Sequence, residues 1–179
     1  MTTSAFVAGS EPVNVQRFDE RWLPDLMSWF HDAHSCGTWA GPQFRFPFSE
    51  GTFRDDARID RLSSWALPSS DGSLGAFGQY YLRLGRCHLA RLVVAPALRG
   101  RGIGGTLIRE LCDRGCEKLG TDTCSLFVLA GNVSALQLYR RLGFAEVPYP
   151  EPSSMLEGSL YMVASLDQLM RNRTGRRTA

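Results

Sequence analysis

The sequence predicts a mixed α/β fold, in which a central sheet of parallel and antiparallel strands carries helices on both faces. Short segments rich in apolar and β-branched residues alternate with segments whose apolar residues recur at helical spacing. A glycine-rich loop over residues 99–104 follows one predicted strand and opens a long helix. Another strand comes next, and a strand–helix–strand unit of this kind places its two strands parallel in one sheet.

The first half of the chain is predicted to contain two helices and a strand hairpin. Trp22, Leu26 and Trp29 share one face of the first helix, and Ser49 can cap the second. The segment between the helices is rich in aromatic residues and contains two prolines, which predicts a loop. In order, the elements are a helix over 21–30, the loop over 39–48, a helix over 52–61, and strands over 63–67 and 74–84 joined by a turn over 69–72.

The second half is predicted to contain the strand–helix–strand unit, a second helix and two final strands. Pro96 ends the first strand, and Gly120 and Gly143 lie where helix C-termini favour a left-handed residue. Phe144 can make the apolar contact that often accompanies such an end. In order, the elements are a turn over 85–86, a strand over 87–94, a helix from the glycine loop to 119, a strand over 123–129, a helix over 134–142, and strands over 144–147 and 160–163.

Length and composition predict one domain over residues 1–179, with polar, flexible tails over about 1–11 and 171–179. The arginines of the second tail fit a solvated end or a contact with an acidic partner. The net charge of +2 is too small to indicate a nucleic-acid partner, and no apolar run approaches the length of a membrane span. The sequence does not reveal the oligomeric state, so a homodimer stays open.

The cysteines predict a reducing compartment. There are five of them, an odd number, and they form no C-x-x-C pair: Cys36, Cys87, Cys112, Cys116 and Cys124. A secreted disulfide framework normally uses an even set in a shorter chain. Residues 1–10 also lack the basic start and apolar run of a signal peptide. We therefore expect five reduced thiols in a cytoplasmic protein.

The glycine loop has the features of a phosphate-binding site. The first amide groups of a helix have no acceptor within the helix, and the helix dipole is positive at this end. Glycines let the backbone approach an anion closely, while Arg99 and Arg101 add positive charge. A structural turn with exposed arginines would use the same residues. Other features of the sequence are therefore needed to distinguish a phosphate-binding site from a structural turn.

Two common phosphate-binding patterns fit the loop poorly. A P-loop requires lysine at the position that Thr106 occupies. Gly100, Gly102 and Gly105 match the dinucleotide pattern G-x-G-x-x-G, but residues 95–99 separate them from the strand. The following strand also ends without the acidic residue that would bind a ribose. A nicotinamide dehydrogenase is therefore disfavoured.

A third pattern, Gln/Arg-x-x-Gly-x-Gly/Ala, is matched by Arg99, Gly102 and Gly104. With the preceding strand, residues 92–104 resemble the strand and pyrophosphate loop of the GCN5-related N-acetyltransferase (GNAT) superfamily. Residues 132–144 resemble the second signature of that family, and the two segments occur in the family's order and separation. The resemblance covers roughly the second half of the chain.

This resemblance implies the GNAT acyltransferase fold, with splayed parallel strands over 87–94 and 123–129 that hold the pantetheine arm of acetyl-CoA. It also implies transfer of the acetyl group to a primary amine through a ternary complex. The alternative is a non-catalytic acyl-CoA-binding module of the same fold. The implied cofactor-binding residues are Leu92, Val93, Val94, Arg99, Gly100, Arg101, Gly102, Ile103, Gly104, Gly105, Thr106, Asn132, Ala135 and Tyr139.

Acetyl transfer needs a polarised carbonyl, a neutral amine and a thiolate that is protonated or stabilised as it leaves. The resemblance implies that a backbone N–H near Val94 polarises the carbonyl and that Tyr139 is the acid, although Tyr139 also fits simple packing on a helix. Asn132 can cap its helix or bond the pantetheine arm. His88 lies on the same side of its strand as Val94 by a period of two, and it is the candidate base. Water can take this role instead.

Three further features have both a functional and a structural interpretation. His31, His34 and Cys36 form a cluster in which the His-x-x-His spacing can put two ligands on one helix face, but a zinc site needs more ligands than these, so we expect no metal. The aromatic residues of segment 29–53 fit a core or an acceptor pocket. The acidic pair at 55–56 fits a solvated helix face or a site for a cationic acceptor. The sequence does not identify the acceptor amine.

Overall fold

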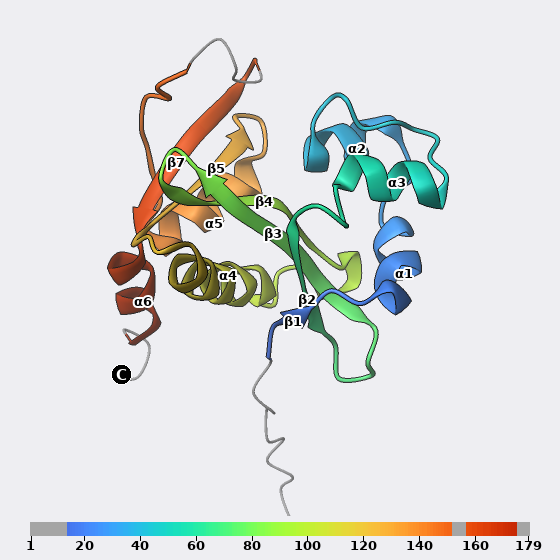
Figure 1. Ribbon diagram of the computed structural model, residues 1–179, viewed down its shortest axis with the longest axis horizontal. Coiled ribbons are helices and arrows are strands. Elements are labelled where there is room, and N and C mark those ends of the chain that lie inside the picture. Colours follow the sequence, from blue (N-terminus) through green and yellow to red (C-terminus); the bar gives the residue numbers. More distant parts are fainter. Residues whose placement is uncertain (1–13, 152–156, 175–179) are drawn as a thin grey trace, which may run out of the picture.

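The computed structural model describes residues 14–151 and 157–174. Its seven-stranded sheet has the order β1-β2-β3-β4-β5-β7-β6 (Figure 1). β4 and β5 pair in parallel and all other neighbours pair antiparallel, which confirms the predicted mixed α/β fold. The strands are β1 (Gln16–Arg17), β2 (Ser63–Pro68), β3 (Leu74–Arg83), β4 (Arg86–Val94), β5 (Thr123–Leu129), β6 (Ala145–Glu146) and β7 (Ser159–Ser165).

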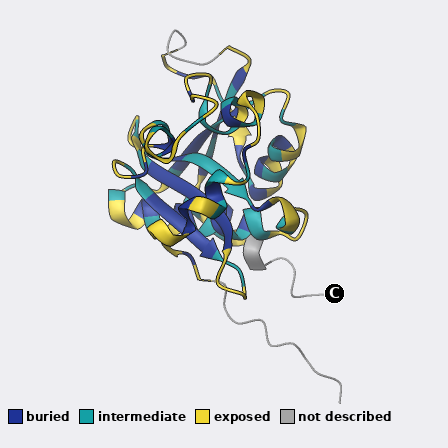
Figure 2. Ribbon diagram, turned by 90° about the vertical axis from the view of Figure 1, so that its right-hand side faces the viewer, coloured by how far each residue is buried: buried dark blue, intermediate teal, exposed yellow. Residues whose placement is uncertain are grey.

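Helices cover both faces of the sheet. One apolar core lies between the sheet and α4, α5 and α6, and a second lies between the sheet and α1, α2 and α3. In Figure 2 the strands are largely buried, and exposed residues gather in loops and on outer helix faces. The helices are α1 (Leu23–Met27), α2 (Ala33–Ala40), α3 (Glu50–Ala57), α4 (Ile103–Leu119), α5 (Val133–Leu142) and α6 (Leu166–Thr174), with 3-10 turns at Glu20–Trp22 and Pro96–Leu98. Within the described residues, none of these helices is long and apolar enough to cross a membrane.

A bulge in β4 interrupts its pairing with β3. At this point Arg91 and Leu92 together lie opposite the single residue Gly78. Arg91 has the positive φ of 50° that a bulge can require. Leu92 then packs toward α4, where a Cβ atom on Gly78 would lie 2.8 Å from Leu92 and 2.6 Å from Leu111. Glycine at position 78 therefore makes room for the bulged strand.

The parallel pair β4–β5 is joined at one end only. Residues 87–89 of β4 pair with 124–126 of β5, whereas the two strands continue to Val94 and Leu129 without further pairing. The predicted splay is therefore confirmed. The edge of β4 that faces β5 carries backbone amide and carbonyl groups with no strand partner beyond Leu89.

In the N-terminal half, several predicted boundaries are wrong. The first helix does not run over 21–30, because a 3-10 turn leads into α1, which ends at Met27. Part of the predicted loop over 39–48 is helical, since α2 extends to Ala40. The missed signal is Asp32, whose side chain caps α2 by accepting a hydrogen bond of 2.6 Å from the Ser35 amide.

Three other boundaries also differ from the prediction. α3 ends at Ala57 rather than at 61, because Arg58 adopts a left-handed conformation with φ 52°. The β3–β4 turn is formed by Leu84 and Gly85, both with positive φ, as a two-residue hairpin turn requires. Residues 171–174 belong to α6 and not to a tail, since Leu169 of that helix packs into the core. The predicted tail over 1–11 and residues 175–179 lie outside the described residues.

Gly78→Ala is expected to destabilise the fold by about 1–3 kcal/mol, because the added methyl group overpacks the contact between the bulge and α4. Urea unfolding measures this loss. The control is Gly37→Ala on α2, where a Cβ meets no atom within 4 Å. Alanine favours a helix, so this control should be neutral or stabilising. Equal stability of the Gly78→Ala variant and the wild type would refute the role of the bulge.

Candidate functional site

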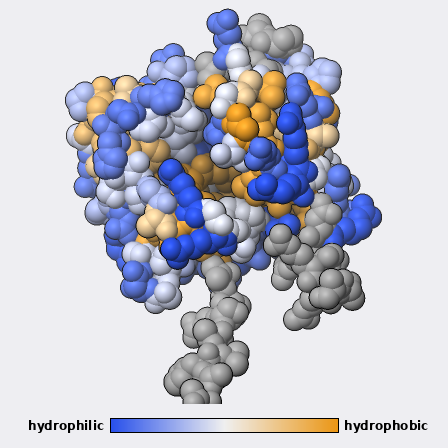
Figure 3. All heavy atoms as spheres, turned by 180° about the vertical axis from the view of Figure 1, so that it is seen from behind, coloured by the Kyte–Doolittle hydropathy of each residue, from blue (hydrophilic) through white to orange (hydrophobic). Residues whose placement is uncertain are grey.

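A groove of about 1940 Å³ opens where β4 and β5 separate. α2, β4, the glycine loop, β5 and α5 line it. Figure 3 shows the molecule from behind with a hollow in this face, in which hydrophobic atoms lie recessed between hydrophilic side chains. The groove brings together His88 and all predicted cofactor-binding residues except Thr106.

The glycine loop presents free amides to this groove. Gly100 and Gly102 have φ values of 75° and 81°, which an L side chain rarely adopts. The amides of Gly105 and Thr106 both donate to the Gly102 carbonyl, at 3.1 and 3.3 Å. The backbone amides of these two residues are therefore already paired, and the predicted role of Thr106 in cofactor binding stays a prediction. Within the described residues, the amides from Gly100 to Gly104 have no backbone acceptor, so they can bind an anion.

The loop is fixed on both sides. The Arg99 Nε atom donates a hydrogen bond of 3.2 Å to the Val94 carbonyl, which ties the loop to the end of β4. Gly104 lies against α5, where a Cβ atom would be 3.2 Å from Leu138 and 3.5 Å from Val94. The absence of a side chain at Gly104 thus allows α4 to start close to both β4 and α5.

The groove is positively charged. Arginines line it on several sides, including Arg83 and Arg91 on the strands and Arg99 and Arg101 in the loop. Within the described part of the chain, no aspartate or glutamate lines it. An anionic group is therefore favoured along much of its length.

Tyr139 lies in the wall of the groove, in the last turn of α5. The helix ends as predicted, because Gly143 has φ 109° and the Phe144 amide donates to the Tyr139 carbonyl at 3.0 Å. The Phe144 ring then packs on the Tyr139 ring at a centroid distance of 5.9 Å. Burial raises the pKa of Tyr139 to about 12. Its phenol therefore keeps its proton near neutral pH and can donate it.

Asn132 has the structural role that the sequence offered as one alternative. Its side-chain oxygen accepts a hydrogen bond of 3.3 Å from the Ala135 amide and so caps α5. Asn132 and Ala135 also line the groove. The amide NH₂ group of Asn132 can therefore face a ligand while its oxygen holds the helix.

His88 lies on a different side of β4 from Val94, so the prediction by a period of two is wrong. The bulge at Arg91 and Leu92 adds a residue and reverses the alternation beyond it. His88 is 2% exposed, and its Nδ1 atom lies 2.9 Å from the Ser125 hydroxyl. Burial and the nearby charge of Arg83 lower the pKa of His88 to about 3.

The other sequence candidates have structural roles. Cys36 is buried while His31 and His34 are exposed, and these three do not form a ligand cluster in the described structure. The aromatic residues of segment 29–53 mainly form the second core, although Trp29, Phe30 and Trp39 also line the groove. Neither residue of the acidic pair 55–56 lines the groove, and Arg45 binds the second through a bond of 2.8 Å.

Comparison with known proteins identifies a family. The sequence profile of the acetyltransferase (GNAT) family matches residues 23–144. The chain is 35% identical over 101 residues to the ribosomal protein bS18-alanine N-acetyltransferase of Escherichia coli strain K12. This alignment covers 56% of the chain and 66% of that relative, slightly less than two thirds of its length. A streptothricin acetyltransferase of Streptomyces lavendulae is 35% identical over 100 residues, which cover 52% of each protein.

Solved structures share the fold. The crystal structure of the Escherichia coli ribosomal-protein-S18-alanine N-acetyltransferase superposes with a TM-score of 0.57 at 26% identity, covering 86% of this chain and 93% of that one. The spermidine N-acetyltransferase of Vibrio cholerae in complex with CoA and spermine superposes with a TM-score of 0.66, covering 88% and 97%. Its identity of 16% supports similarity of fold alone.

His88→Gln is expected to reduce the acid sensitivity of the fold. Below about pH 6.5 the unfolded chain protonates His88 while the folded chain does not, so stability falls as the pH falls toward 3. The variant should lose on the order of 1–2 kcal/mol less than the wild type between about pH 6.5 and pH 5. Urea unfolding at the two pH values measures this. His34→Gln is the exposed control, and identical pH dependence of His88→Gln and wild type would contradict the buried, neutral ring.

Proposed function

This chain belongs to the acetyltransferase (GNAT) family, and on that premise we propose that it transfers the acetyl group of acetyl-CoA to a primary amine in a ternary complex. The observation that carries the proposal is the position of the glycine loop, the unpaired edge of β4 and Tyr139 around one groove. Each supplies one requirement of acyl transfer, namely an anion site, backbone donors and an acid.

The cofactor-binding roles follow from the groove. The free amides of Gly100 to Gly104 would donate hydrogen bonds to the pyrophosphate, with Arg99 and Arg101 adding charge. The unpaired edge of β4, residues 90–94, would bind the pantetheine arm as an added strand. A backbone N–H near Val94 would polarise the acetyl carbonyl.

The proton-transfer roles differ between the two sequence candidates. Tyr139 is protonated at neutral pH and would donate to the departing sulfur. His88 is a weak base at this site, because burial opposes its protonated form. We therefore assign the proton of the attacking amine to water rather than to His88.

The charge of the groove favours one class of acceptor. A polyamine carries several positive charges, and no carboxylate in the described part of the groove would bind them. The α-amine of a peptide N-terminus is a single charge and is neutral once it is ready to attack, whereas a polyamine keeps the charges of its other nitrogens. The similarity to an enzyme that acts on an alanine of ribosomal protein bS18 points the same way. We therefore propose a peptide or protein N-terminus as the acceptor.

A reducing compartment suits this protein. All five cysteines are buried and free, as the sequence predicted for reduced thiols. We propose the cytoplasm as its location for this reason.

Acetyl-CoA is expected to bind in a calorimetric titration, and an alanine-starting peptide should then release free CoA thiol faster than spermidine does. The reason for the second result is the repulsion of a polycation by the arginine-lined groove. Faster turnover of spermidine would overturn the acceptor assignment. Absence of acetyl-CoA binding would overturn the function itself, and binding without turnover of any amine would favour the non-catalytic module.

Tyr139→Phe is expected to lower kcat by about 100-fold or more, because the departing sulfur loses its proton donor. The Kd for acetyl-CoA should change little, since the ring and its packing on Phe144 remain. Steady-state kinetics and calorimetry measure the two quantities. The matched control is Tyr80→Phe, a buried tyrosine of β3 outside the groove. An unchanged kcat in the Tyr139→Phe variant would remove Tyr139 from the mechanism.

A further inference from the structure

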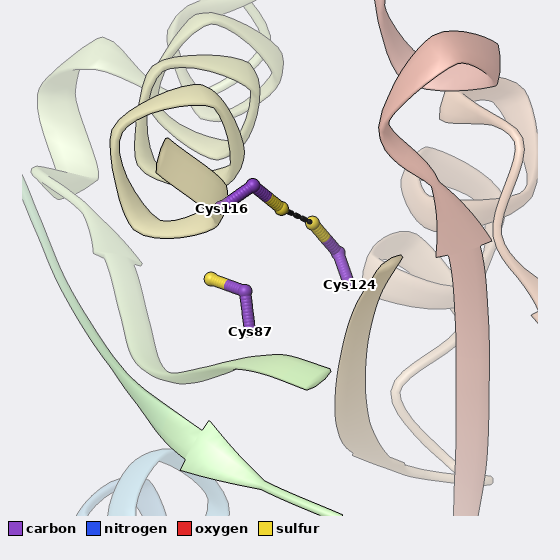
Figure 4. A group of neighbouring side chains, drawn as sticks. All are labelled: Cys87, Cys116 and Cys124. Carbon is purple, nitrogen blue, oxygen red and sulfur yellow. Dashed lines mark hydrogen bonds between the residues drawn. The ribbon is translucent and has the colours of Figure 1, made fainter. Parts of the chain in front are cut away.

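Three buried cysteine thiols gather at the end of the β4–β5 pair that lies away from the groove (Figure 4). Cys87 and Cys124 face each other in register near the starts of β4 and β5, and Cys116 projects from the last turns of α4. Their sulfur atoms all lie within 4.8 Å of one another, and those of Cys116 and Cys124 are 3.4 Å apart. None of the three residues is more than 2% exposed.

The surrounding backbone leaves space for these sulfurs. A Cβ atom on Gly115 would collide with the Cys87 sulfur, so α4 can approach β4 here only because position 115 is glycine. The thiols thus meet where α4, β4 and β5 come closest together. Sulfur atoms bound to one tetrahedral zinc ion lie about 3.8 Å apart, since each Zn–S bond is about 2.3 Å. The observed cluster is close to this spacing.

An acidic depression of the surface borders the cluster at Cys116. Its volume is about 690 Å³, and Cys116 forms part of its lining. Asp113, Glu117 and Asp122 line the same depression, and all three are exposed. Carboxylates at the mouth raise the local concentration of cations. A cation attracted by these carboxylates would therefore lie beside Cys116, the member of the cluster that borders the depression.

We propose that Cys87, Cys116 and Cys124 bind a soft, thiolate-seeking metal ion that reaches them through this depression. Thiolate ligands select Cu(I) and Zn(II) among the available ions, and each thiol that binds releases its proton to water. Three sulfurs alone suit Cu(I). Tetrahedral Zn(II) needs a fourth ligand, for which Cys112, buried one turn before Cys116 on α4, is the candidate.

The proposed ion would join α4 to the two parallel strands at the only place where those strands pair within the described structure. It would therefore stabilise the closed end of the pair, while the open end holds the groove. Metal bound only by the folded state raises the unfolding temperature with metal concentration. This effect does not depend on the proposed acetyl transfer.

The test is a titration of the full, reduced chain with Zn(II) and, separately, with Cu(I), each in competition with a chromophoric chelator. We expect one ion per chain, a sulfur-to-metal charge-transfer band and a raised Tm. Substitution with Co(II) reports whether thiolates coordinate the ion. Cys116→Ala and Cys124→Ala should abolish binding, and Cys36→Ala, a buried cysteine outside the cluster, should retain it. Cys112→Ala should weaken Zn(II) binding more than Cu(I) binding.

Three results would overturn the proposal. The first is failure of the reduced wild-type chain to bind either ion. The second is binding that shows no charge-transfer band, and the third is binding that survives in the Cys116→Ala variant. The wild-type titration and its spectrum decide the question even if a cysteine variant does not fold, because both readouts report on thiolate ligation directly.

Discussion

The loss of pairing between β4 and β5 beyond Leu89 is the constraint on which the rest of the structure depends. An unpaired strand edge inside a protein is costly unless its backbone groups find partners. The bulge at Arg91 and Leu92 lies just beyond the last paired residue of β4, and Gly78 makes room for it beside α4. The gap between the two strands is the groove. The groove is therefore formed by the geometry of the backbone, and the sheet determines where the side chains that line it lie.

The elements around the gap are held in place by contacts at their ends. The Arg99 side chain donates a hydrogen bond to the Val94 carbonyl, and this bond holds the glycine loop and its free amides in a fixed position. Phe144 closes the end of α5 and packs on the Tyr139 ring, which places the phenol in the groove wall. The proposed anion site and the proposed acid are thus positioned by a strand end and by a helix end.

The two ends of the strand pair have opposite character. The open end is lined by arginines and suits an anionic ligand, whereas the closed end holds buried thiols beneath a surface with three carboxylates. α4 connects the ends, since its first turn carries the glycine loop and its last turns carry Cys116. A metal ion at the closed end would stabilise the point from which the strands diverge.

The features that depend on local chemistry can be predicted from the amino-acid sequence. The glycine loop, the helix end at Gly143 and Phe144, and the strand hairpin were all predictable, because each rests on the conformation of a few adjacent residues. Only the tertiary structure decided the rest. The bulge places His88 and Val94 on opposite sides of β4, which cannot be predicted by assuming that side chains alternate regularly along the strand. The thiol cluster joins positions 87, 116 and 124, which are far apart in the sequence and meet only because a parallel strand pair brings its starts together beneath one helix.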